Sequence, residues 1–399
     1  MIDRIQRALK EADLDGWLFY SFRGSDPIDA NILGAGGEGH IATRRWFYLI
    51  PAAGVATRLV HSIERDVLDN LPGDKLIYLP WQQLHSHLRA SLGALTAARQ
   101  PRVAMQYSPD AAIPYLSRVD AGTIELIRSF GVEIVSSADL VQQFESAWGD
   151  EQLAMHEEAA RALYEIVHNA FQEIGTRIKA GARTTEYDIQ QFILGRFGVR
   201  GLITRDPPIV AVNANSAKPH YEPTHGRHSE IKPDDFVLID LWAKPDRANS
   251  VYADITWTSY VGASVPDEIT KVFNVVRDAR DAATNFVKDA FAAGKNIFGW
   301  QVDDVCRAVI KDAGYADYFI HRTGHNIHTE VHGNGANIDN LETRDGRALI
   351  PRTCFSIEPG IYLEGRFGVR SEIDVYVSEG EARVTGGEPQ REVVAILAQ

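Results

Sequence analysis

Two carboxylates stand in a pair of apolar segments near the middle of the chain. Asp240 follows four apolar residues in FVLID, and Asp254 begins the apolar segment DITWTSYVG after a polar loop that contains a proline. Two such segments joined by a loop predict a β-hairpin. A carboxylate among apolar strand residues is costly unless its charge is compensated. A single Asp of this kind is as readily a hydrogen-bonded structural residue, but two on neighbouring strands indicate a shared cation.

The C-terminal third of the chain supplies further groups of the same chemical kind. GHNIHTEVHG carries three histidines, FSIEPGIY carries Glu358, and GVRSEIDVYV carries Arg370, Glu372 and Asp374. Alternate residues of a strand share a face, so the last three should project to one side of their strand. The histidines are His325, His328 and His332.

Several carboxylates cannot converge in a dry pocket without cations that neutralise them. The spacing is too wide for an EF-hand loop, and two cysteines provide no zinc pattern. Four carboxylates and one imidazole are the ligands that a pair of divalent cations prefers. The sequence therefore predicts a dinuclear metal centre.

The ordered motifs Asp…Asp-Ile-Thr…Gly-His-x-Ile-x-x-x-Val-His…Glu-Pro-Gly-Ile-Tyr…Arg-x-Glu resemble the M24 metallopeptidase family, over residues 150–399. That family includes methionine aminopeptidase, Xaa-Pro aminopeptidase and Xaa-Pro dipeptidase (prolidase). The resemblance implies an α+β "pita-bread" fold, a curved and mainly antiparallel sheet backed by helices. The metal ligands that it implies are Asp240, Asp254, His325, Glu358 and Glu372.

The resemblance also implies a role for each side chain. Asp240 would ligate one metal, Asp254 and Glu372 would bridge both, and His325 and Glu358 would complete the second, with Glu358 also shuttling a proton. An oxygen-rich ligand set favours Mn²⁺, with Co²⁺ or Zn²⁺ as alternatives. The other implied catalytic residues are His220 and His332, as donors to the substrate carbonyl, and Arg370, which would orient Glu372 or bind the carboxylate of a dipeptide.

Three residues are expected on the substrate side of the site, and a fourth residue of interest is a tryptophan. Most of them replace a residue type that the family usually has at that position. His321 precedes the ligand histidine by four residues and is expected to face the substrate. His328 and Trp242 stand where the family usually has Gly, and Trp257 stands where it usually has Arg. We expect all of these departures to alter the pocket wall and substrate preference, and to leave the metal ligands intact.

Composition limits the class of protein. The chain has 399 residues, 45% of them hydrophobic and 24% charged, with a formal net charge of −13. Such acidity argues against nucleic-acid binding, and no apolar run is long enough for a membrane span. Cys306 and Cys354 form no disulfide framework, are expected to be buried, and favour the reducing cytoplasm.

The elements that must position these residues divide the chain into an N-terminal α/β domain (1–150) and a catalytic domain (151–399). Short strands are predicted at 17–20, 45–50, 56–61, 75–79, 102–107 and 132–135, with helices at 81–94 and 110–129 between them. The Gly-rich segment 32–40 lacks the spacing of a phosphate-binding loop. This domain is similar to the one that precedes the catalytic domain in creatinase, prolidase and Xaa-Pro aminopeptidase.

The catalytic domain should contain four long helices behind its strands. They are predicted near 151–179, 184–201, 266–291 and 300–314 from their apolar period. His156 on the first of them is expected to be a partly exposed structural residue.

Three functions are compatible with this pattern. The first is an Xaa-Pro dipeptidase, and the second is an Xaa-Pro aminopeptidase that acts on longer peptides. The third is a creatinase-like hydrolase or a metal-free peptide-binding module, although relatives of that kind lack ligand carboxylates. The resemblance alone implies a homodimer.

Overall fold

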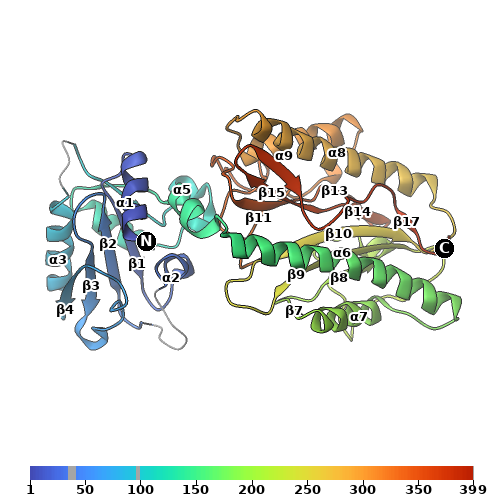
Figure 1. Ribbon diagram of the computed structural model, residues 1–399, viewed down its shortest axis with the longest axis horizontal. Coiled ribbons are helices and arrows are strands. Elements are labelled where there is room, and N and C mark those ends of the chain that lie inside the picture. Colours follow the sequence, from blue (N-terminus) through green and yellow to red (C-terminus); the bar gives the residue numbers. More distant parts are fainter. Residues whose placement is uncertain (35–41, 96–98, 399) are drawn as a thin grey trace. The chain divides into compact units, whose positions relative to one another are not determined.

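The computed structural model describes residues 1–34, 42–95 and 99–398, so most of the Gly-rich segment 32–40 lies outside the described residues. The chain divides into two compact units, Met1–Glu145 and Ser146–Gln399 (Figure 1). The functional residues predicted above all belong to the second unit.

The first unit is a six-stranded mixed sheet with helices on both faces. The strand order is β4-β3-β2-β1-β5-β6, with β1 antiparallel to β2 and parallel to β5. The strands are β1 (Gly16–Ser21), β2 (Trp46–Pro51), β3 (Thr57–His61), β4 (Asp74–Tyr78), β5 (Arg102–Met105) and β6 (Glu133–Ser136). The α-helices are α1 (Ile2–Glu11), α2 (Pro27–Leu33), α3 (Trp81–Gly93), α4 (Ala121–Arg128) and α5 (Ala138–Val141).

Alternation along the central strands produces two separate cores in this unit. Trp17 and Phe19 of β1 pack with α1 and α2, whereas Leu18 and Tyr20 pack with α3 and α4. Successive side chains of a strand point to opposite faces, so a sheet that is apolar on both faces needs helices on both. All six predicted strands are confirmed.

The helix predicted at 110–129 is much shorter in the structure. Two 3₁₀ turns begin at Pro109 and Pro114, and α4 starts only at Ala121. Proline removes a backbone donor and restricts the preceding residue. Asp120 then caps α4, because its side chain accepts from the backbone N–H of Thr123 at 2.9 Å.

The second unit is built from three sheets and two pairs of helices. The sheets are β17-β10-β9-β7, with β8 also paired to β9, then β11-β12-β15-β16, and the pair β13-β14. The strands are β7 (Leu202–Ile203), β8 (Ile209–Val212), β9 (Phe236–Pro245), β10 (Ala253–Tyr260), β11 (Asn326–Ile327), β12 (Thr353–Ile357), β13 (Gly360–Leu363), β14 (Phe367–Arg370), β15 (Ile373–Ser378), β16 (Glu381–Val384) and β17 (Val394–Ala395). The helices are α6 (Asp150–Lys179), α7 (Glu186–Val199), α8 (Asp267–Ala292) and α9 (Gly299–Asp312).

The two faces of the β9–β10 hairpin belong to different cores. Val237, Ile239 and Leu241 pack against α6 and α7, whereas Phe236 and Leu238 join the core that contains α8 and α9. The four predicted long helices are thereby confirmed, and they lie as two pairs around the strands (Figure 1). None of the described helices is long and apolar enough to cross a membrane.

Candidate metal centre and peptidase site

The β9–β10 hairpin brings the two central carboxylates together. The strands pair antiparallel, with Asp240 opposite Thr256 and Asp254 opposite Trp242. Because alternate residues share a face, all four side chains lie on the side opposite the α6 core. The hairpin predicted from the sequence is therefore confirmed, with both carboxylates on one face.

The C-terminal strands bring two more carboxylates to that face. Glu358 follows directly after β12, and Glu372 lies in the short break between β14 and β15. The backbone N–H of Glu372 donates to the carbonyl oxygen of Thr256 at 3.2 Å. This bond ties the break to the middle of β10, beside Asp254.

His325 is fixed by backbone contacts with β12. Its N–H donates to Ser356 Oγ at 3.0 Å, and the Ser356 N–H donates back to the His325 carbonyl at 2.9 Å. The close approach requires glycine at the preceding position, because a Cβ on Gly324 would lie 1.9 Å from the Ser356 carbonyl oxygen. Glycine alone admits a neighbouring backbone so closely.

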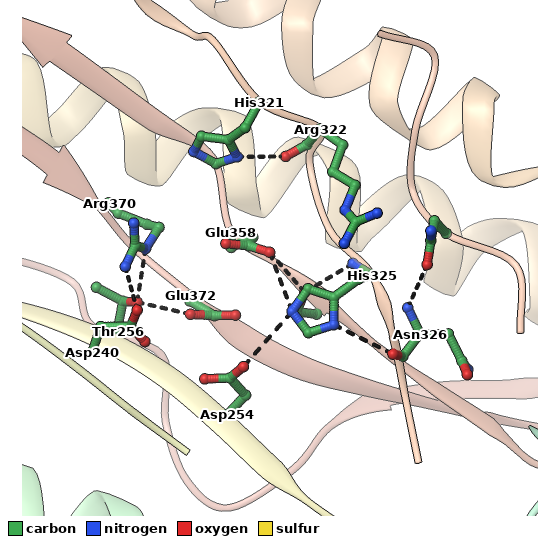
Figure 2. Close-up of polar contacts among 12 residues, drawn as sticks. Asp240, Asp254, Thr256, His321, Arg322, His325, Asn326, Glu358, Arg370 and Glu372 are labelled. Carbon is green, nitrogen blue, oxygen red and sulfur yellow. Dashed lines mark hydrogen bonds and ion pairs between the residues drawn. The ribbon is translucent and has the colours of Figure 1, made fainter. Parts of the chain in front are cut away.

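The imidazole of His325 presents Nε2 to two carboxylates (Figure 2). Nε2 lies 3.4 Å from Glu358 Oε1 and 3.7 Å from Asp254 Oδ2, while Nδ1 faces the Asn326 carbonyl at 3.3 Å. A carbonyl only accepts, so Nδ1 carries the proton and Nε2 offers a lone pair. Burial lowers the pKa of His325 well below its usual value, so the neutral ring points this lone pair at two carboxylates.

One arginine compensates part of this acidity. Arg370 forms an ion pair with Asp240, donates from Nε to Thr256 Oγ1 at 3.0 Å, and donates from Nη1 to Tyr362 Oη at 3.1 Å. Thr256 Oγ1 in turn donates to Glu372 Oε2 at 2.7 Å. Figure 2 shows Arg370 reaching Asp240 and Thr256, with Glu372 next in line. Arg370 thus acts on Glu372 through a hydroxyl and on Asp240 directly.

The remaining carboxylate oxygens lack partners in the part of the chain that the structure describes. Asp240 Oδ1, Asp254 Oδ1 and Glu372 Oε1 are buried and accept no hydrogen bond there. Burial raises the pKa of Asp254 and Glu372 well above its ordinary value, and it raises the pKa of Glu358 to about 7. Partnerless buried oxygens are costly, and together with the Nε2 lone pair they form the donor set that a divalent cation needs.

The ligand atoms also converge in space. Suitable atoms of Asp254, His325 and Glu372 all lie within 4.8 Å of one another, and all three residues are buried. Glu358 contacts the same imidazole, and Asp240 connects to Glu372 through Arg370 and Thr256. The five residues predicted as ligands therefore belong to one connected group that fits metal ions.

His332 and His220 lie at the exposed side of this group. The His332 ring packs edge-on against His325, with 4.3 Å between ring centroids. His220 lines an open hollow of about 500 Å³ together with His321. Both His332 and His220 are exposed, and neither imidazole has a hydrogen-bond partner among the described residues. Their ring nitrogens are free for a substrate.

His321 is held in place on both ring nitrogens. Nδ1 lies 2.7 Å from the Arg322 carbonyl and therefore carries the proton, while Nε2 lies 2.7 Å from Tyr362 Oη and accepts its proton. Burial lowers the pKa of His321 to about 3. The neutral ring is thus a fixed part of the wall of the hollow, and Tyr362 Oη links it to Arg370.

His328 and Trp242 lie near the turn of the hairpin. The carbonyl of His328 accepts the N–H of Tyr252 at 2.9 Å, and Nδ1 of its buried ring lies 3.2 Å from Thr329 Oγ1. Trp242 is half-buried against a small core that includes Tyr252 and Val331. Neither side chain contacts Arg370 or the carboxylates through any hydrogen bond between described residues.

Two expectations from the sequence are wrong. Trp257 does not line the site, because it is one residue out of phase with Asp254 and Thr256 and so points to the other face of β10. There its ring contacts Tyr164 and His168 of α6 at 5.8 and 4.6 Å between centroids. His156 is not partly exposed but completely buried.

Sequence reasoning also missed Thr256 and Tyr362, which connect Arg370 to Glu372 and to His321. Thr256 had a usable signal, because it follows Asp254 by two residues and so shares its face. Tyr362 had only a motif signal, as the last residue of Glu-Pro-Gly-Ile-Tyr, and its strand β13 pairs with β14, which ends at Arg370. The alternation predicted for 369–375 holds: Arg370 and Glu372 face the site, and Val369, Ile373 and Val375 face the core.

Comparison with known proteins agrees with this geometry. A sequence model of metallopeptidase family M24 matches residues 158–379, more than half of the chain. The chain is 34% identical over 173 residues to a putative Xaa-Pro aminopeptidase of Mycoplasma pneumoniae, covering 43% of this chain and 44% of that protein. It is 35% identical over 164 residues to an Xaa-Pro dipeptidase of Lactobacillus delbrueckii subsp. lactis, covering 41% of this chain and 40% of that protein. Both matches thus span less than half of each relative.

The crystal structure of a dipeptidase from Pyrococcus horikoshii OT3 resembles the whole chain. The TM-score is 0.64 with 26% sequence identity, and the match covers 99% of both chains. It includes the N-terminal α/β unit as well as the pita-bread unit, which confirms the fold class expected from the sequence. The buried Asp/His/Glu group, the matched fold and the family model lead to one conclusion: the chain belongs to metallopeptidase family M24.

Proposed function

We propose that this chain is a metal-dependent Xaa-Pro dipeptidase, which hydrolyses the bond between an N-terminal residue and a following proline. The observation that carries the proposal is the group of buried carboxylates around His325, whose partnerless oxygens call for cations. The Lactobacillus relative is named an Xaa-Pro dipeptidase, and the full-length structural neighbour is named a dipeptidase. These names support the choice of substrate.

Five side chains are proposed to hold two divalent cations. Cations bound there would provide hydroxide at neutral pH and polarise the scissile carbonyl. The oxygen-rich set leads us to propose Mn²⁺, with Co²⁺ or Zn²⁺ as alternatives. The ligands are Asp240, Asp254, His325, Glu358 and Glu372.

The remaining steps fall to side chains at the edge of the group. Glu358 would take the proton of the attacking water and return it to the proline nitrogen. His332 and His220 have free ring nitrogens and donate to the substrate carbonyl oxygen as it gains charge. One such donor contributes about 10²–10³ in rate.

Arg370 is proposed as a positioning residue. Its N–H groups already bond Asp240, Thr256 and Tyr362. The guanidinium therefore holds residues of the site and is not proposed to bind the carboxylate end of a peptide. His321, His328 and Trp242 are proposed as parts of the substrate pocket. Of these three residues, His321 is the one that lines the hollow of about 500 Å³ beside His220.

An Xaa-Pro aminopeptidase is the second candidate. The open hollow beside His220 and His321 supports it, because residues beyond the proline would find room there. The Mycoplasma relative carries that name. A creatinase-like hydrolase or a metal-free binding module is disfavoured, since relatives of that kind lack ligand carboxylates and this chain has the full set.

Hydrolysis assays separate these candidates. The purified protein is stripped with chelator, reloaded with Mn²⁺, and given Leu-Pro beside Leu-Pro-Xaa. Metal-dependent cleavage of the dipeptide alone is expected. Equal or faster cleavage of the tripeptide would assign the aminopeptidase, and protein that binds no metal would contradict both.

Two further properties concern the assembly and the location of the protein. We propose a homodimer, from the family resemblance alone. We propose a reducing compartment such as the cytoplasm, because Cys306 and Cys354 are both free and buried. Size-exclusion chromatography with light scattering tests the first property, and fractionation tests the second.

A further inference from the structure

The strand that carries Asp254 has one edge without a continuous neighbour. Along its whole length β10 pairs with β9, but on the other edge β17 pairs only with Ser259 and Tyr260. Peptide groups of alternate residues point to opposite edges of a strand. The even-numbered peptide groups before Tyr260 must therefore find other partners.

Those partners are mostly side chains. His156 Nδ1 lies 2.7 Å from the Tyr252 carbonyl, and Asp374 Oδ2 accepts the Asp254 N–H at 2.9 Å. The backbone N–H of Glu372 donates to the Thr256 carbonyl, as described above. The side-chain amide of Gln390 accepts the backbone N–H of Thr258 at 2.9 Å and donates to the backbone carbonyl of Thr258 at 2.6 Å. On this edge the backbone from Tyr252 to Asp254 is thus held by two side chains rather than by a strand.

This support matters most at Asp254. Pairing with β9 starts at Ala253, one residue before it, and strand ends are the first parts of a sheet to open. The preceding residue Tyr252 is held by the His328 carbonyl and by His156. Without His156 and Asp374, the carboxylate would stand at a frayed strand end.

His156 is placed for hydrogen bonding rather than for packing. Its side chain is completely buried, with its ring 4.8 Å from Trp148. The Tyr252 carbonyl can only accept, so Nδ1 carries the proton, and Nε2 accepts from Thr385 Oγ1 at 2.7 Å. An aliphatic side chain would be cheaper to bury among these neighbours, so the bond to Tyr252 is what the imidazole adds.

Asp374 lies next to this imidazole. Its side chain is 1% exposed, and Oδ2 is 3.9 Å from His156 Nε2. The Asp254 N–H is the hydrogen-bond donor that the structure gives to Oδ2, while Oδ1 has no partner among the described residues. A buried carboxylate with so little compensation is expensive, which points to a function for the bond to Asp254.

We propose that His156 and Asp374 form a positioning pair that fixes the backbone from Tyr252 to Asp254 and so directs the Asp254 carboxylate into the metal centre. The inference rests on the proposed function. Neither residue touches substrate, and both act through the backbone of β10. Partners behind the ligands of a metal typically contribute 10–100-fold in affinity or activity.

Variants at position 156 test the pair. His156→Asn keeps a donor where Nδ1 stands, whereas His156→Gln moves the donor to the place of Nε2, and His156→Leu removes it. Trp148→Phe is the matched control, because it disturbs the same small core and its buried Nε1 has no partner to lose.

Three measurements are made on each full-length protein. They are the absorption spectrum and affinity of added Co²⁺, amide exchange of the peptide spanning 252–256 without metal, and kcat and KM with Mn²⁺. We expect His156→Leu and His156→Gln to bind Co²⁺ about 10–100-fold more weakly, to exchange faster and to lose kcat at constant KM. His156→Asn should behave like the wild type, and Trp148→Phe should lower only the melting temperature.

The outcomes are distinguishable. The pair is overturned if His156→Gln matches the wild type in spectrum and exchange, or if Trp148→Phe changes them as much as His156→Leu. Should His156→Leu fail to fold, the comparison of Asn with Gln still decides. A wild type that binds no Co²⁺ would refute the proposed function, whereas exchange in the metal-free protein would still test the restraint.

At position 374 the same logic applies. Asp374→Asn retains an oxygen that accepts the Asp254 N–H, and Asp374→Leu does not. We expect Co²⁺ affinity close to wild type for the first and about 10–100-fold weaker binding for the second. Equal affinities for the two variants would contradict a role through this hydrogen bond.

Discussion

Each unit of the chain buries acidic side chains, and the two groups are satisfied in different ways. In the first unit, Asp26 caps α2 by accepting from Ile28 and Asp29 N–H at 2.9 and 3.3 Å. Asp29 accepts the Tyr20 N–H at 3.0 Å and the side-chain amide of Gln106. Neutral donors hold both side chains, although Asp26 Oδ2 lacks a partner among the described residues. Burial raises the pKa of both carboxyls and so favours their protonated, uncharged forms.

In the second unit the buried acids are more numerous and less well supplied. Asp240, Asp254 and Glu372 each keep an oxygen without a partner among the described residues, and one guanidinium, that of Arg370, serves the group. Ligand atoms of Asp254, Glu372 and His325 lie within 4.8 Å of one another. Buried carboxylates alone therefore do not identify a metal centre; convergent oxygens without donors do.

The largest expected effect is a loss of metal binding, which should occur when an acid of the second unit is replaced and not when an acid of the first unit is replaced. We expect Asp254→Asn to lose metal binding and to reduce activity more than 10³-fold, which exceeds the effect of one oxyanion donor. Without metal, the same variant should be more stable than the wild type by about 1–4 kcal/mol, because it removes a carboxyl group that is costly to bury either as an ion or with a proton held above its ordinary pKa. Thermal unfolding with and without Mn²⁺ measures both.

Asp29→Asn in the first unit is the matched control for that experiment. It should leave the Mn²⁺-induced rise in melting temperature of the second unit unchanged. A wild-type chain that gains no stability from Mn²⁺, or an Asp254→Asn chain that gains as much as the wild type, would contradict the assignment of the second group to metal.

A smaller effect distinguishes residues within the second unit. His332→Ala should lower kcat about 10²–10³-fold, as the loss of one oxyanion donor does. It should retain the Mn²⁺-induced stabilisation, because His332 adjoins His325 without facing the carboxylates. Metal content by elemental analysis checks this, and an empty site would mean that the two histidines have exchanged roles.

The smallest expected effect is a pH dependence of the stability of the first unit. Burial raises the pKa of Asp26 from 3.8 to about 6. Between these values the folded unit retains a proton that the unfolded chain loses, so the contribution of Asp26 to stability is complete below about pH 4 and decreases as pH rises to 6, by at most about 3 kcal/mol. Exchange protection of the β1 peptide, measured between pH 4 and 7, should follow this decrease.

Asp26→Asn should make that pH profile shallower, since an amide still caps α2 but does not ionise, while Asp29, whose pKa burial raises well above its usual value, accounts for the remaining slope. A profile that rises with pH in the wild type, or that keeps its slope in Asp26→Asn, would show that another group controls the stability of the first unit.

Much of the fold and the site could be predicted from local pattern. Apolar alternation located the hairpin with Asp240 and Asp254, and it placed Arg370 and Glu372 on one face. The same rule, applied to Trp257, would have excluded it from the pocket, because it is out of phase with Asp254. The family resemblance led to the pocket interpretation and overrode the periodicity.

Other features depend on tertiary contacts that no local pattern encodes. His156 has the helical context of a surface residue, yet it is buried because Trp148 and the start of β10 pack over it. Tyr362 meets His321 across 41 positions of the chain. The pairing of these residues is decided by how distant segments meet, which periodicity within one segment does not reveal.

The wide separation of the site residues along the chain has a consequence for biosynthesis. Thr256 and Glu372 are bonded across 116 positions, and Asp254 meets Asp374 across 120. Long-range contacts of this kind form slowly and close late. Metal loading must therefore follow synthesis of nearly the whole second unit, and until then the nascent chain exposes acidic side chains that hold no metal and cannot yet cut a peptide.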